Sequence, residues 1–143
     1  MKKGVILTAS IFLMMSIFIC LTSCGKKSDS TDLWENAIYT EDATLGRGNK
    51  TIIVEIEAEE KSVELKINTD KEVLGDALSE HNLISGEQGE YGLYVKVVNG
   101  IKADYDENQC YWAFNKDGEG MMTGVDGAKI TDGEHYEIVY TKQ

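Results

Sequence analysis

The chain has 143 residues and carries 25 acidic against 14 basic side chains, which gives a formal net charge of −11. This acidic balance argues against nucleic acid as a partner, because binding to phosphates requires lysine and arginine. The sequence holds no phosphate-loop motif and no arrangement of serine, histidine and aspartate that is typical of a hydrolase. We therefore expect a protein that is not an enzyme.

The beginning of the chain has the pattern of an export signal. Lys2 and Lys3 precede an apolar run over 5–21, and Leu21-Thr22-Ser23-Cys24 ends it. These four residues resemble the lipobox of bacterial lipoproteins, which implies cleavage before Cys24 and diacylglycerol on its thiol. The alternative is an uncleaved transmembrane anchor, since the run is at the short end of the roughly 17–25 residues that span a bilayer. We favour the lipoprotein because cysteine stands where the lipobox requires it.

This interpretation divides the chain into three regions. They are a lipoprotein signal peptide over 1–23, a lipidated Cys24 with a flexible linker over 24–49, and a globular domain over 50–143. The linker begins with residues that have no apolar side chain, and Trp34 is placed where it could contact the domain. We expect the protein on the extracytoplasmic face of the cell membrane, held there by its lipid.

Cysteine and histidine are scarce in the mature chain. Cys20 leaves with the signal and Cys24 carries lipid, so that Cys110 is the remaining thiol. One cysteine with two histidines is too few ligands for a zinc site. We expect neither a metal nor a cofactor, and we expect Cys110 to be an inert, half-buried strand residue.

The first half of the domain reads as a hairpin followed by a helix. Residues 52–57 and 63–68 alternate apolar and polar side chains with period two, which predicts two strands joined at 58–61. Residues 72–81 place Val73, Leu74, Ala77 and Leu78 at helical spacing, with Asp70 as the expected N-cap and Gly86 ending the region.

The second half reads as a series of strands. We expect strands over 93–98, 101–104, 110–114 and 136–140, with turns at Asn99-Gly100, 116–118 and 131–133. Strands before and after one helix predict an α+β domain, in which a mixed sheet carries that helix on one face.

Six short motifs stand in one order along this domain. They are 73–78, 91–94, 98–100, 111–114, 123–126 and 130–136. In this order they resemble the bacterial domain of unknown function that is similar to the C-terminal domain of transcobalamin and intrinsic factor. The resemblance implies a β-grasp-like fold and cobalamin, or another corrinoid, as a possible ligand. The helical domain that completes the pocket of the animal cobalamin carriers is absent from this sequence.

The candidate binding residues centre on the aromatic strand. Trp112 and Phe114 share one face of it, and that face is either part of the core or an exposed binding patch. Tyr94 is expected on the open side and Tyr91 in a loop at the rim. Met121 and Met122 point to opposite faces if they are extended, so at most one of them joins the patch.

Two stretches resemble calcium loops weakly. Asn115, Asp117, Glu119, Gly120 and Asp126 have part of the spacing, and Asp104, Asp106 and Asn108 have less of it. We interpret both stretches as hairpin turns. Two functions remain open: a surface lipoprotein that binds a small flat ligand for uptake, or a module that docks another protein of the cell envelope through a sheet edge.

Overall fold

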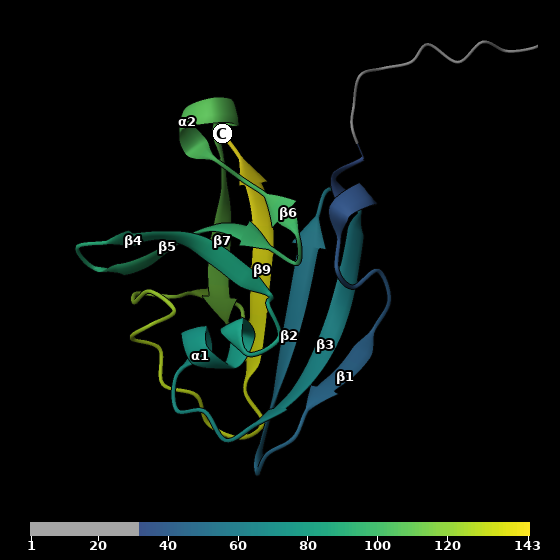
Figure 1. Cartoon of the computed structure of the whole chain (residues 1–143), viewed down its shortest axis with the longest axis vertical. Coiled ribbons are helices and arrows are strands. Elements are labelled where there is room, and N and C mark those ends of the chain that lie inside the picture. Colours follow the sequence, from purple (N-terminus) through teal and green to yellow (C-terminus); the bar gives the residue numbers. More distant parts are fainter. Residues whose placement is uncertain (1–31) are drawn as a thin grey trace, which may run out of the picture. The chain divides into compact units, whose positions relative to one another are not determined.

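The computed structural model describes residues 32–143 (Figure 1). Residues 31–143 form one compact unit, and the signal peptide, the lipobox and Cys24 lie outside the described residues. Within 32–143, no helix is both long enough and apolar enough to cross a bilayer.

The larger of two sheets has six strands in the order β1-β3-β2-β9-β7-β8. β1 and β2 span Ala43–Gly46 and Lys50–Ala58, and β3, β7, β8 and β9 span Lys61–Thr69, Cys110–Lys116, Glu119–Gly120 and His135–Lys142. β2 runs antiparallel to β3 and parallel to β9, while β1 runs parallel to β3. The expected mixed sheet is therefore present.

The β2–β3 hairpin confirms the two strands that were predicted from alternating apolar and polar residues. Its register pairs Lys50 with Thr69 and Ala58 with Lys61. Alternate side chains, including Ile52, Val54 and Leu65, are fully buried, and the residues between them face solvent or are half-buried. Burying one aliphatic side chain stabilises the fold by about 1.5–3 kcal/mol, so this apolar face fixes the register.

A second, smaller sheet was not predicted. β4 (Ile84–Gly89), β5 (Gly92–Val98) and β6 (Ile101–Lys102) pair in that order and have no partner in the larger sheet. The strand expected over 93–98 thus exists, but it pairs with β4, which was not expected. The sequence had placed Gly86 at the end of the helical region. Gly86 lies instead inside β4 at a register shift, where a Cβ atom would lie 1.8 Å from the Tyr94 carbonyl oxygen.

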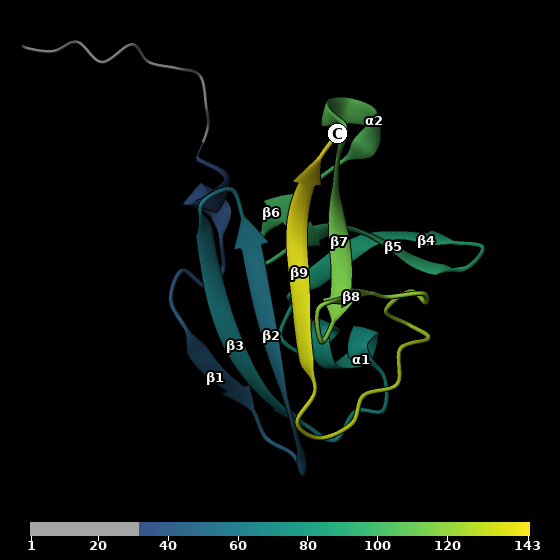
Figure 2. The ribbon, with the colours of Figure 1, turned by 180° about the vertical axis from the view of Figure 1, so that it is seen from behind.

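The helices are short: η1 spans Leu33–Asn36, α1 spans Leu74–Ser79 and α2 spans Tyr105–Asn108. Figures 1 and 2 show α1 and the smaller sheet on the same side of the larger sheet, next to β7 and β9. Asp70 is not the N-cap of α1, because Val73 holds that position and the Asp70 carboxylate accepts hydrogen bonds from Asn49. The turn at Asn99-Gly100 is confirmed, with both residues at positive φ.

Residues 33–49, which we expected to belong to a flexible linker, pack on the domain. Trp34 is 6% exposed, and its Nε1 donates a 3.0 Å hydrogen bond to the Ala58 carbonyl oxygen. The backbone of Tyr39 exchanges two hydrogen bonds with the buried side chain of Asn99, and β1 pairs with β3. The folded domain therefore begins before Lys50, near residue 33.

One hydrophobic core joins these parts. It contains the inward side chains of β2, β3, β7 and β9, together with Leu74 and Leu78 of α1, Ile84 of β4 and Val98 of β5. β5 of the smaller sheet and β7 of the larger sheet lie close to each other. The candidate site lies where they meet.

Candidate functional site

Trp112 and Phe114 of the aromatic strand β7 point to the core side of the sheet. Trp112 lies opposite Tyr140 of β9, and Phe114 lies opposite Ile138. Trp112 is 6% exposed and its ring meets Tyr140 edge-on, with centroids 5.3 Å apart, whereas Phe114 is half-buried. Of the two alternatives that the sequence left open, the core face is the one observed, and the rings lie at its margin.

A pocket of about 360 Å³ opens at this margin. Its walls come from β5, from β7 and from the loop after β8, and it is lined by Leu93, Tyr94, Val95, Trp112, Phe114, Met121, Met122, Thr123, Gly124 and Val125. Five of the six predicted binding residues therefore line one pocket. Tyr91, the sixth, lies at the tip of the β4–β5 hairpin, is 95% exposed and does not line this pocket.

The loop over residues 121–130, which we call the strap, supplies one wall. It connects β8 toward β9 past α1, as Figure 2 shows. Met121 N donates to the Phe114 carbonyl oxygen, and Ile130 N donates to that of Glu72. The strap is not an extended strand, so the condition under which at most one methionine would join the patch is not met: Met121 and Met122 both line the pocket.

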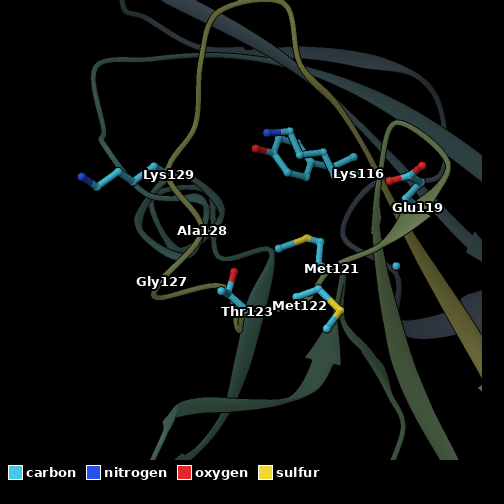
Figure 3. Close-up of a pocket in the computed structure, with 10 residues that line it drawn as sticks. Lys116, Glu119, Met121, Met122, Thr123, Gly127, Ala128 and Lys129 are labelled. Atoms are coloured by element: carbon cyan, nitrogen blue, oxygen red, sulfur yellow. The ribbon is translucent and has the colours of Figure 1, made fainter.

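A second pocket of about 310 Å³ lies on the other side of the same methionines. It shares Met121, Met122 and Thr123 with the first pocket and adds Lys116, Glu119, Gly120, Gly127, Ala128, Lys129 and Tyr136. Figure 3 shows the methionine pair between these polar residues, with the Lys129 side chain pointing away from it. Most side chains that line the pocket of Trp112 are aliphatic, aromatic or thioether, and none is charged, so we call it the apolar pocket.

An ion-paired network lies beside the second pocket. Tyr136 Oη donates to the Glu134 carboxylate, which also pairs with Lys116 Nζ and accepts from Thr131 N. Burial opposes ionisation of Glu134, but the hydrogen bonds from Lys116 and Tyr136 outweigh it and hold the pKa of Glu134 below its usual value. Burial and the neighbouring Glu134 raise the pKa of Tyr136, so that its phenol stays protonated. The network orders this wall and keeps the Glu134 carboxylate ionised.

Trp112 also carries an unused hydrogen-bond donor. Within residues 32–143, its Nε1 is one of three buried side-chain nitrogens that lack a partner, beside those of His81 and His135, and it alone belongs to a residue that lines the apolar pocket. Buried donors are nearly always paired, because an unpaired one costs about 1–3 kcal/mol.

Neither stretch that resembles a calcium loop forms one. Residues 115–120 form the β7–β8 hairpin, with Asp117 and Gly118 at positive φ, so the first is a hairpin turn as predicted. The second is not a turn, because Asp104 caps α2 and pairs with Lys96. The described part of the chain contains no group of three or more His, Cys, Asp or Glu residues that could hold a metal ion.

Residues 71–142 match the model of a family described as "Domain of unknown function (DUF4430)". The chain belongs to this family. No curated protein matches the sequence. Among solved structures, the DUF4430 chain is similar to a proposed metal-binding protein from Ruminococcus gnavus ATCC 29149, with 32% identity over 66% of this chain and 99% of that one, and a TM-score of 0.63.

The DUF4430 chain is also similar in fold to haptocorrin, whose structure was determined in complex with Cbi. The identity is 16% over 68% of this chain, and the TM-score is 0.54. The match spans 26% of the haptocorrin chain. At this identity the likeness concerns the fold alone, and it shows a fold similar to part of haptocorrin.

Proposed function

We propose that this DUF4430 domain binds a small, flat, largely apolar ligand, without catalysis, in the pocket between β5, β7 and the strap. The observation that carries the proposal is the convergence of Tyr94, Trp112, Phe114 and the methionine pair, from three separate segments, on one pocket. Its volume of about 360 Å³ lies in the roughly 300–1,000 Å³ range of small-molecule sites. Thioethers adapt to irregular shapes, so Met121 and Met122 suit contact with a planar surface.

A corrinoid is a candidate of this class. The similarity in fold to haptocorrin supports it. The macrocycle is wider than the pocket, so the domain would cover one edge or face of it. A second surface, on a partner protein, would then cover the rest.

We also propose that the domain works at the membrane, held on the extracytoplasmic side by diacylglycerol on Cys24. The lipobox residues 21–24 support this, and the acidic surface would add no attraction to anionic lipid. In this setting the protein would serve as a solute-binding or accessory component in uptake.

Tryptophan emission tests the binding proposal. In residues 31–143 carrying Trp34→Phe, Trp112 is the sole tryptophan, and cobalamin added at increasing concentration should quench its emission saturably after correction for absorption. Met122→Ala, at a side chain that is 98% exposed, should weaken binding without loss of fold, while the matched control Tyr91→Ala should not. A linear, non-saturating response that is equal in all variants would refute corrinoid binding in this pocket.

One observation favours docking of another envelope protein as a second candidate. Tyr91 is 95% exposed at the β4–β5 tip, and β4 leaves one backbone edge unpaired within the described sheet. Exposed tyrosine and a free strand edge are features of protein-binding surfaces. If docking is the function, Tyr91→Ala should abolish capture of the partner, whereas Met122→Ala should leave it unchanged.

A further inference from the structure

Two of the three walls of the apolar pocket, those from β5 and from the strap, come from parts of the chain that share no sheet. Leu93, Tyr94 and Val95 belong to the smaller sheet, and Met121 to Val125 belong to the strap. The distance between these walls decides what the pocket can admit. Among residues 32–143, one side-chain hydrogen bond joins them: Leu93 N donates to Asp126 Oδ2 at 2.9 Å.

Glycines make room for this carboxylate on both sides. A Cβ atom at Gly92, which has φ of +108°, would lie 3.0 Å from Asp126 Oδ2, and one at Gly75 would lie 2.7 Å from Asp126 Oδ1. A side chain at either position would push the carboxylate away from Leu93. Three segments, α1, β5 and the strap, therefore meet around one aspartate.

Backbone hydrogen bonds join the strap to β7, through Met121 N and the Phe114 carbonyl oxygen, and to α1. Leu74 N and Gly75 N donate to the carbonyl oxygens of Ala128 and Val125, at 2.8 and 2.9 Å, which fixes residues 125–128 to the beginning of α1. Neither of these bonds reaches β5. The part that faces both pockets, Met122 to Gly124, is exposed, and an added Cβ at Gly124 would meet no atom within 4 Å.

We propose that Asp126 is a positioning residue for the apolar pocket: its carboxylate fastens the beginning of β5 to the strap and so sets the width of the binding site. The inference rests on the proposed ligand-binding function. Asp126 itself does not line the pocket, so its effect on a ligand passes through Leu93 and Val125.

The test compares Asp126→Ala, Asp126→Asn and Asp42→Ala in residues 31–143, which hold the whole described core. Asp42 is the matched control, because its carboxylate also accepts one backbone hydrogen bond, from Glu64 N at 2.8 Å, and it lies on the far edge of the larger sheet. Asparagine keeps an acceptor oxygen, so Asp126→Asn serves as the conservative rescue. The probe is 1-anilinonaphthalene-8-sulfonate, and amide hydrogen exchange at Leu93 is measured in parallel.

We expect Asp126→Ala to raise the Kd of the probe by roughly three- to tenfold, the equivalent of one lost hydrogen bond. Leu93 exchange should quicken, Asp126→Asn should restore most of the affinity, and Asp42→Ala should change neither readout. Faster Leu93 exchange with an unchanged Kd would overturn the positioning role, as would equal losses of affinity in Asp126→Ala and Asp42→Ala. Unchanged Leu93 exchange would refute the bond itself. If the wild-type domain binds no probe, the proposed function and the positioning role fall together, and Leu93 exchange alone still decides whether the bond exists.

Discussion

The two tryptophans allow one chemical change to be made at two equally buried positions. Trp34 and Trp112 are each 6% exposed, and they differ in the partner of the indole nitrogen. Trp34 Nε1 donates to the Ala58 carbonyl oxygen at 3.0 Å, whereas Trp112 Nε1 has no partner. Trp34→Phe therefore removes a hydrogen bond and leaves a buried acceptor, while Trp112→Phe removes an unpaired donor.

The two substitutions should differ clearly in their effect on stability. Both remove similar apolar volume, which destabilises both variants by a comparable amount. Losing the hydrogen bond from Trp34 to the Ala58 oxygen costs about 0.5–1.5 kcal/mol, and removing the unpaired donor of Trp112 returns about 1–3 kcal/mol. We expect Trp34→Phe to lower the free energy of unfolding by about 2 kcal/mol more than Trp112→Phe does.

Urea unfolding of residues 31–143, followed by circular dichroism, measures this difference. If Trp112→Phe were as destabilising as Trp34→Phe, or more so, the indole nitrogen of Trp112 would already have a partner in the folded protein. The assignment of Trp112 Nε1 as an unpaired donor would then be wrong.

Two further predictions concern acid and lipid. Because hydrogen bonds and Lys116 lower the folded-state pKa of Glu134, its stabilising contribution is complete above the usual carboxyl pKa and disappears as the pH falls through the lowered one. Glu134→Gln should therefore destabilise the domain at pH 7 by about 1–3 kcal/mol, and by less in strong acid, which urea unfolding at several pH values would check. Cys24→Ser should prevent incorporation of labelled fatty acid, and a lipidated Cys24→Ser protein would contradict the lipobox assignment.

The parts of the fold that carry a strong local pattern were predictable. The 52–57 and 63–68 strands follow from alternation against one buried face, and Asn99-Gly100 follows from the positive φ that both residues adopt. β4 was missed because its side chains from Ser85 onward are exposed, which removes the alternation that predicts a strand. Contact of Trp34 with the domain was considered from the sequence, but its partner was not predicted, because the Ala58 oxygen lies 24 residues away.

The site was predictable in its residues more than in its geometry. Rings and thioethers were chosen as binding residues by their chemistry, and most of them gather at one pocket. The sequence could not decide whether the Trp112 side chain faces the core, because no local pattern indicated the smaller sheet. The strap was missed because its course follows from hydrogen bonds to Glu72, Leu74 and Gly75, which are distant in sequence. The sequence indicated Asp126 only as part of a weak calcium-loop pattern. Its contacts with Leu93, Gly75 and Gly92 depend on the fold and could not be predicted.

The most direct test of the central claim uses the methionine pair itself. Residues 31–143 contain two methionines, Met121 and Met122, and both line the proposed pocket. A sample labelled with 13C at the methionine methyl groups should therefore give two signals, each a reporter of the site. The account predicts that cobalamin or 1-anilinonaphthalene-8-sulfonate shifts both signals saturably, with one Kd for the pair. Two unmoved signals at saturating concentrations of both compounds would contradict it.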